Sequence, residues 1–165
     1  MIIWVEKTMQ SQKSTKEFYK QFSEKTGDTV NSVVLAKISG VPSFVLNQVG
    51  LSYPKGQDFL WGLLILGEKD IHFFVHPSEG LLVSMFRATG NGEAPKEQYV
   101  RIEKSSLADI SPEPVRKSLI PLFSPQPKVI LISFYTPQSE KITLPFEPIN
   151  GLKKIMPLFD AYKTK

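Results

Sequence analysis

His72 and His76, the two histidines of the chain, are the first residues whose type and spacing could perform chemistry. They lie in the segment FLWGLLILGEKDIHFFVHP, residues 59–77, which reads as two apolar strands around a polar turn. Positions i and i+4 of a strand face the same side but lie roughly 13 Å apart. Ligands of one metal ion must be far closer together. We therefore expect no metal site here, and we interpret both histidines as residues on the polar face of a strand.

Other catalytic motifs are also absent from the sequence. No Gly-x-Ser-x-Gly nucleophile motif occurs, there is no cysteine, and the carboxylates are spread without a paired motif. The glycine-rich stretch 89–92 lacks the lysine and the spacing of a phosphate-binding loop. We predict no catalytic residue, cofactor or metal. The alternative is an enzyme or a small-ligand-binding barrel whose site is assembled only on folding.

The charge pattern argues against nucleic acid as a partner. The 165 residues include 20 basic and 16 acidic side chains, a net charge of +4, and no polybasic run. Four scattered basic residues are candidates for contact with an anion: Lys55, Arg87, Arg101 and Lys104. The sequence also lacks a secretory signal pattern and a long apolar span, so a soluble, cytoplasmic protein is expected.

Two features near the N-terminus could contact a partner. Residues 14–17, Ser-Thr-Lys-Glu, form a capping box that predicts a helix over 15–26, with Phe18 and Phe22 on one face. Ile3 and Trp4 belong to an apolar pentapeptide before this helix, which would add an edge strand or dock on another chain.

The middle of the chain predicts antiparallel strands joined by short turns, with no helices between them. The expected strands cover 30–40, 59–66, 71–76, 81–87, 98–103, 128–136 and 141–146, with 43–49 as a resumption of the first. Residues 105–110 read as a strand end or a single turn. An amphipathic helix over 149–162 ends the pattern, with Pro157 expected to bend it or to start a second turn.

A family resemblance follows from these patterns. The stretch GLLILGEKDIHFFV, residues 62–75, resembles the strand-turn-strand of GRAM and bacterial pleckstrin-homology-like (PH-like) domains. YVRI at 99–102 and LADI at 107–110 are similar to a later strand of that family. The resemblance covers roughly 30–163. It implies an α+β, mainly β fold: a seven-stranded antiparallel PH-like barrel with a C-terminal capping helix, to which this chain adds an N-terminal helix.

The resemblance also implies an organisation and a function. It implies one domain over 1–165, with 1–28 as an N-terminal strand and helix extension and 29–165 as the barrel plus its helix. Members mostly bind lipids, peptides or protein surfaces, so we expect a non-enzymatic module for a protein or peptide partner, with self-association as one form. Partner contacts would involve Trp4, Ile3, Phe18 and Phe22. The alternative is an adaptor on an anionic membrane surface. The lipid-binding members carry a basic cluster around the first hairpin, and this chain departs from it, with only Lys55 in the loop before the hairpin and Lys69 beside two acidic residues in its turn.

Overall fold

The computed structural model describes residues 15–75, 97–115 and 125–164. An N-terminal helix over 15–26 precedes the strands. The remaining elements, in chain order, are β1 (Val30–Ser39), α2 (Ser43–Gln48), β2 (Phe59–Gly67), β3 (Ile71–Val75), β4 (Gln98–Ile102), η1 (Lys104–Ser106), β5 (Leu107–Pro112), β6 (Ile130–Tyr135), β7 (Lys141–Pro148) and α4 (Leu152–Lys163).

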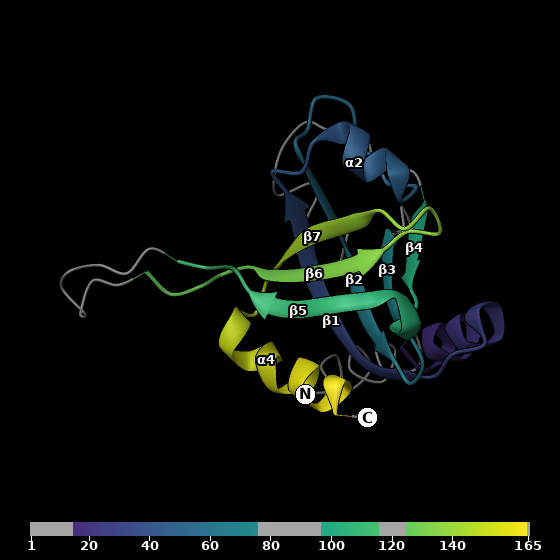
Figure 1. The fold of residues 1–165 in the computed structure, drawn as a ribbon. Coiled ribbons are helices and arrows are strands. Elements are labelled where there is room, and N and C mark those ends of the chain that lie inside the picture. The colour runs from purple at the N-terminus through teal and green to yellow at the C-terminus, as the bar shows by residue number, and fades with distance from the viewer. Residues whose placement is uncertain (1–14, 76–96, 116–124, 165) are drawn as a thin grey trace, which may run out of the picture.

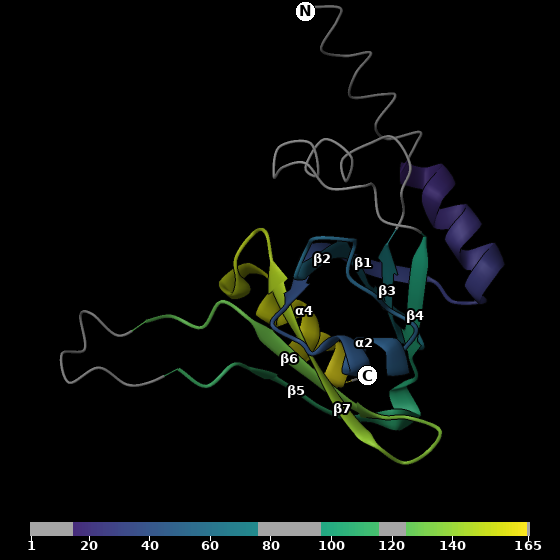
Figure 2. The same cartoon turned by 90° about the horizontal axis from the view of Figure 1, so that it is seen from above.

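The seven strands form one antiparallel sheet in the order β4-β3-β2-β1-β7-β6-β5. Strands β1–β4 make one layer, and β5–β7 make a second layer that crosses it (Figures 1 and 2). The layers are joined by a short ladder, in which only Ala36 with Pro148 and Lys37 with Glu147 pair β1 with β7. The outer strands β4 and β5 share no ladder among the described residues, so the sheet is not closed there. The prediction of an antiparallel, mainly β fold is confirmed, whereas closure into a barrel is not.

The hydrophobic core lies between the two layers and is closed at its ends by helices. In Figure 1, α2 lies at one end of the layers and α4 at the other. The core-facing residues of α4 are Leu152, Ile155, Phe159 and Tyr162, and α2 contributes Leu46. These α4 positions recur at the helical period, so the amphipathic pattern in the sequence predicts this face correctly. The chain stays helical through Pro157, and no second helix starts there.

The N-terminal helix ends where the sequence predicts and packs beside β3 and β4 (Figures 1 and 2). Gly27 has a φ of +69°, and its amide donates to the Ser23 carbonyl, which ends the helix. Phe22 is only 6 % exposed. The predicted aromatic face of this helix therefore packs against the domain itself.

Residues 43–49 are not a strand, and this expectation is wrong. Pro42 begins α2 instead, and its carbonyl accepts from the amides of Val45 and Leu46. Leu46 is the one buried side chain of this segment, so the segment lacks the alternation of buried and exposed side chains that a strand would show. Strand β5 is a full strand at the place where a strand end or single turn was expected. The predicted strand over 81–87 lies outside the described residues.

Candidate functional site

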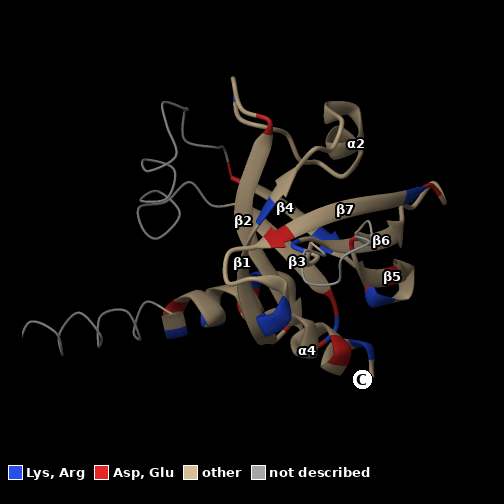
Figure 3. Cartoon of the chain, turned by 90° about the vertical axis from the view of Figure 1, so that its left-hand side faces the viewer, with Lys and Arg blue, Asp and Glu red and all other residues tan. Residues whose placement is uncertain are grey.

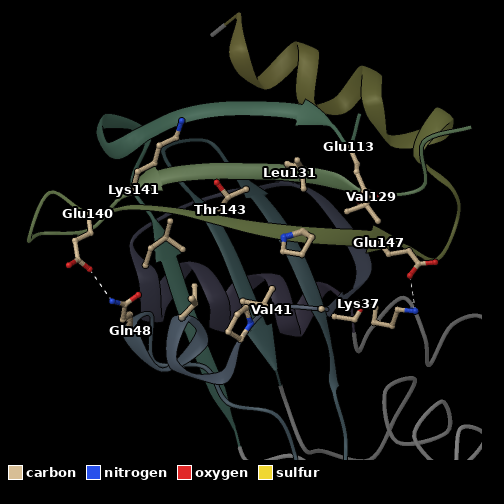
Figure 4. Close-up of a pocket in the computed structure, with 16 residues that line it drawn as sticks. Lys37, Val41, Gln48, Glu113, Val129, Leu131, Glu140, Lys141, Thr143 and Glu147 are labelled. Atoms are coloured by element: carbon tan, nitrogen blue, oxygen red, sulfur yellow. Dashed lines mark hydrogen bonds and ion pairs between the residues drawn. The ribbon is translucent and has the colours of Figure 1, made fainter. Parts of the chain in front are cut away.

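A groove opens where β1 and β7 diverge. The two strands pair only at Ala36–Pro148 and Lys37–Glu147. Beyond this point β1 runs on to α2, while β7 stays paired with β6 along Lys141–Phe146. The space between them has a volume of about 800 Å³ and is lined by residues of both walls. Figure 4 shows α2 and the end of β1 facing β6 and β7 across it.

The wall formed by β1 and α2 is held in place by a tyrosine. The Tyr53 hydroxyl accepts from the Val41 amide at 3.0 Å and donates to the Val41 carbonyl at 2.9 Å. Gly40, with a φ of +72°, makes the turn between β1 and α2. Because the backbone of Val41 is fixed in this way, this wall does not depend on a partner for its shape.

Each end of the groove carries a polar contact between its walls. At one end Lys37 Nζ lies 2.7 Å from a carboxylate oxygen of Glu147, and at the other Gln48 donates to Glu140 at 3.0 Å. Figure 4 shows Glu113 at the same end as Glu147. Apolar side chains lie between the two ends: Val41, Val45, Val129, Leu131 and Pro145. The groove thus has an apolar centre and charged ends, which is the usual composition of a binding cleft.

An exposed aromatic side chain accompanies the groove. Phe44 is 69 % exposed, the most exposed large apolar side chain among the described residues. It lies four positions before Gln48 on α2, so the two side chains share one face of the helix. Gln48 lines the groove. Phe44 is not itself one of the lining residues, but its position on the same helix face as Gln48 places it next to the groove.

A second cluster, buried and polar, ties the N-terminal helix to the sheet. His72 is fully buried on β3, with Nε2 2.9 Å from an Asp28 carboxylate oxygen and Nδ1 2.7 Å from the Tyr99 hydroxyl. Phe22 packs edge-on against the imidazole at 4.9 Å between ring centroids. The sequence correctly places His72 opposite the face of Ile71, but the expected exposure is wrong because the N-terminal helix covers that face.

The hydrogen-bond roles in this cluster follow from its donors. Asp28 accepts from the backbone amides of Thr29, Lys69 and Asp70 at 2.8, 3.0 and 2.9 Å. An ionised carboxylate can only accept, so Nε2 of His72 donates to it. In the neutral ring, Nδ1 then accepts from the Tyr99 hydroxyl. Every polar atom of the cluster has a partner, which is the arrangement expected of a structural anchor.

Asp70 extends the cluster to two of the predicted anion contacts. Its carboxylate accepts from Arg101 Nε at 2.7 Å and from the Lys104 amide at 3.0 Å. The hydrogen bond to Asp70 raises the pKa of Arg101. The ammonium of Lys104 lies over the Tyr162 ring, 5.1 Å from its centroid. Both cations thus already have partners within the domain.

The ionisation of Asp28 should make stability depend on pH. Burial opposes the charge, but the His72 contact and the amides of Lys69, Asp70 and Thr29 outweigh it and lower the pKa to about 2 from 3.8. The carboxyl of Asp28 therefore binds its proton more tightly in the unfolded chain than in the folded one. The ionised carboxylate contributes about 2 kcal/mol to the free energy of unfolding, and this contribution is complete above pH ~4 and lost as pH falls towards 2. The free energy of unfolding, measured in urea between pH 2 and 6, should therefore fall at the acidic end of this range, and an Asp28→Asn variant should lack this pH dependence. Equal slopes in both proteins would contradict the assignment.

The structure brings some of the sequence-predicted site residues together and separates others. Phe18 contacts Phe74, with ring centroids 6.5 Å apart, close to the Phe22–His72 contact. Arg101 and Lys104 meet at Asp70, whereas Lys55 lies exposed in the loop before β2. Ile3, Trp4, Arg87 and His76 lie outside the described residues. Figure 3 shows basic and acidic segments interspersed over the elements.

Sequence reasoning missed Asp28, Tyr99 and the groove. Asp28 follows the glycine that ends the helix, a position that reads as an ordinary loop. It lies 44 positions from His72, and no local spacing relates the two. Among the described residues, no group of three or more His, Asp or Glu side chains is placed to hold a metal ion. None of the helices in the described segments is long and apolar enough to cross a membrane.

Comparisons with known proteins give one structural likeness. No protein-family model matches the chain, and no curated protein matches it in sequence. The chain is similar to a crystal structure of the C-terminal domain of an unknown protein from Leishmania infantum, at 14 % identity and a TM-score of 0.43. The match covers 90 % of this chain and 96 % of that one.

Proposed function

We propose that the chain is a non-enzymatic, PH-like binding module that holds a segment of a protein partner in the groove between α2 and β7. The observation that carries the proposal is the groove itself, with its apolar centre and charged ends, and with the exposed Phe44 on the same helix face as the lining residue Gln48. Large exposed aromatic side chains beside a cleft are frequent sites of high binding energy. The strand order and the C-terminal helix support the PH-like part of the proposal.

The anionic-membrane alternative has less support from the described residues. Arg101 is paired with Asp70, and Lys104 packs on Tyr162. Lys69, in the first hairpin, donates to the Gly27 carbonyl. These cations already have partners, so binding a lipid headgroup would have to compete with contacts inside the domain.

A displayed library of random heptapeptides tests the proposal, with Phe44→Ala as the decisive variant. Peptides selected on the wild-type chain should bind Phe44→Ala at least tenfold more weakly, because truncation of a hot-spot aromatic costs about 2 kcal/mol. Affinity would be measured by calorimetry.

Two controls accompany this measurement. Leu158→Ala removes another exposed apolar side chain, on α4, and should leave affinity unchanged. Unfolding curves should show that both variants are folded. Equal affinity of the wild type and Phe44→Ala would overturn the proposal, as would salt-sensitive sedimentation with anionic vesicles when no peptide is selected.

A further inference from the structure

The groove exposes an unpaired edge of β7. On one side β7 pairs with β6 from Lys141 to Phe146. On the other side it pairs with β1 only at Glu147 and Pro148. Among the described residues no strand continues that ladder over 141–146. The groove lining includes the consecutive residues 141–143 of β7, and also Val129 and Leu131 from β6 and the segment before it, so both the free edge of β7 and the outer face of the β6–β7 layer border the space.

Pro145 shows which backbone groups of β7 face the groove. Proline has no amide hydrogen, so within a sheet it occupies a position whose amide does not serve the neighbouring ladder. In antiparallel pairs, alternate residues direct their N–H and C=O to opposite sides. Pro145 cannot donate to β6, so its position is one whose backbone faces the groove. The N–H and C=O groups of Thr143 and Lys141, two and four residues earlier, point to the same side. Ile142, Leu144 and Phe146 then bond to β6.

The shape of the groove selects an extended segment over a folded sheet. The β7 edge faces α2 across the groove: Val45 and Gln48 line the opposite wall, and Gln48 donates to Glu140 next to the start of β7. The edge strand of a folded partner would bring its neighbouring strands against α2 before it reached β7. A single extended chain has no such neighbours. Residues 141–147 of β7 span about 20 Å, the length of a six- to seven-residue strand.

The charges of the groove add a preference at one end. Glu113 is exposed beside Glu147, and no ion pair joins it to another described residue. Lys37 balances only Glu147. A lysine or arginine of the bound segment would complement this end. At the apolar centre, Leu131 pairs with Pro145 and would accept an apolar side chain.

We propose that the groove binds an extended, unfolded segment of a partner protein as an added β-strand on β7, with main-chain hydrogen bonds to Thr143 and Lys141. The segment has an apolar centre and a basic residue at the end beside Glu113. This inference rests on the proposed function and specifies how its site recognises the partner. Main-chain pairing supplies affinity, and the flanking side chains supply selectivity.

A backbone N-methyl scan of a selected heptapeptide tests this mode. Each methyl group removes one amide donor, so binding should weaken roughly tenfold at alternate positions and change little at the positions between them. Selected sequences should also be enriched in lysine or arginine at one end. A scan without a period of two residues would overturn strand addition.

The pair Thr143→Pro and Thr143→Ala provides the matching change on the protein. Both lose the Thr143 hydroxyl contact with Ser133, but only proline removes the amide that faces the groove. Thr143→Pro should therefore bind the peptide roughly tenfold more weakly than Thr143→Ala. Equal binding of the two folded variants, with Phe44→Ala still defective, would reject strand addition and leave the groove as the site. A Phe44→Ala variant that binds normally would reject the groove as well. A dimer that forms without peptide and is broken by Thr143→Pro would identify a second copy as the occupant and overturn the proposed partner.

Discussion

Replacement of Asp28 with alanine should lower the free energy of unfolding by about 3–5 kcal/mol, as expected when one partner of a buried, hydrogen-bonded pair is removed. The substitution leaves Nε2 of His72 and the amides of Thr29, Lys69 and Asp70 without their acceptor. All these donors lie where the N-terminal helix joins the β2–β3 hairpin. Chemical denaturation monitored by circular dichroism measures the change.

Asp58→Ala is the matched control for this prediction. Asp58 is exposed in the loop before β2, and no ion pair joins it to another described residue. Its loss should change stability by less than about 0.5 kcal/mol. If Asp28→Ala and Asp58→Ala were equally mild, the buried cluster would not be the anchor described above. Loss of only the N-terminal helix signal, with the sheet intact, would instead limit the role of Asp28 to docking that helix.

Gly67→Ala should destabilise the fold by up to about 3 kcal/mol through overpacking. An alanine Cβ at this position would lie 2.1 Å from an Asp28 carboxylate oxygen and 2.8 Å from the Asp70 carbonyl oxygen. Neither group can move without breaking hydrogen bonds of the cluster. Glycine is thus required at the end of β2 because the carboxylate approaches the backbone there, and not because of its backbone conformation.

A double-mutant cycle separates this clash from a general effect on the strand. Asp28→Ala removes the carboxylate oxygen that lies closest to the added Cβ. Gly67→Ala should therefore cost at least about 1 kcal/mol less in the Asp28→Ala background than in the wild type. Additive costs in denaturant unfolding would show that the carboxylate is not what excludes a side chain at position 67.

Much of the sheet could be predicted from local sequence. Strands β2 and β3 are apolar runs around a polar turn, and the helix face of α4 follows from its period. The segment 43–49 was mispredicted because its mixed apolar residues fit a short strand as well as a short helix. The helix is distinguished by the Pro42 carbonyl, which accepts the first hydrogen bonds of the turn, and by the burial of Leu46 in the core. The burial of Leu46 depends on tertiary packing, which local sequence does not give.

The candidate sites could not be predicted in the same way. The burial of His72 requires the N-terminal helix to lie on a particular face of β3, and helix placement is a tertiary property. The groove exists because β1 and β7 pair at only two residues each and then diverge. These paired residues are more than a hundred positions apart in the chain, so no local pattern relates them. Pro145 is the one local signal, since proline inside a strand indicates an edge position.

The most direct test of the central claim is an amide chemical-shift map of the isotope-labelled chain titrated with a selected heptapeptide. Binding on the β7 edge should produce the largest changes at the amides that border the groove: Lys141, Thr143, Val45 and Gln48. The amides of Tyr99, Arg101 and Lys104, on the far edge of the sheet and in η1, should shift little. Changes concentrated at those three residues, with the groove amides unmoved, would contradict the assignment of the groove as the binding site.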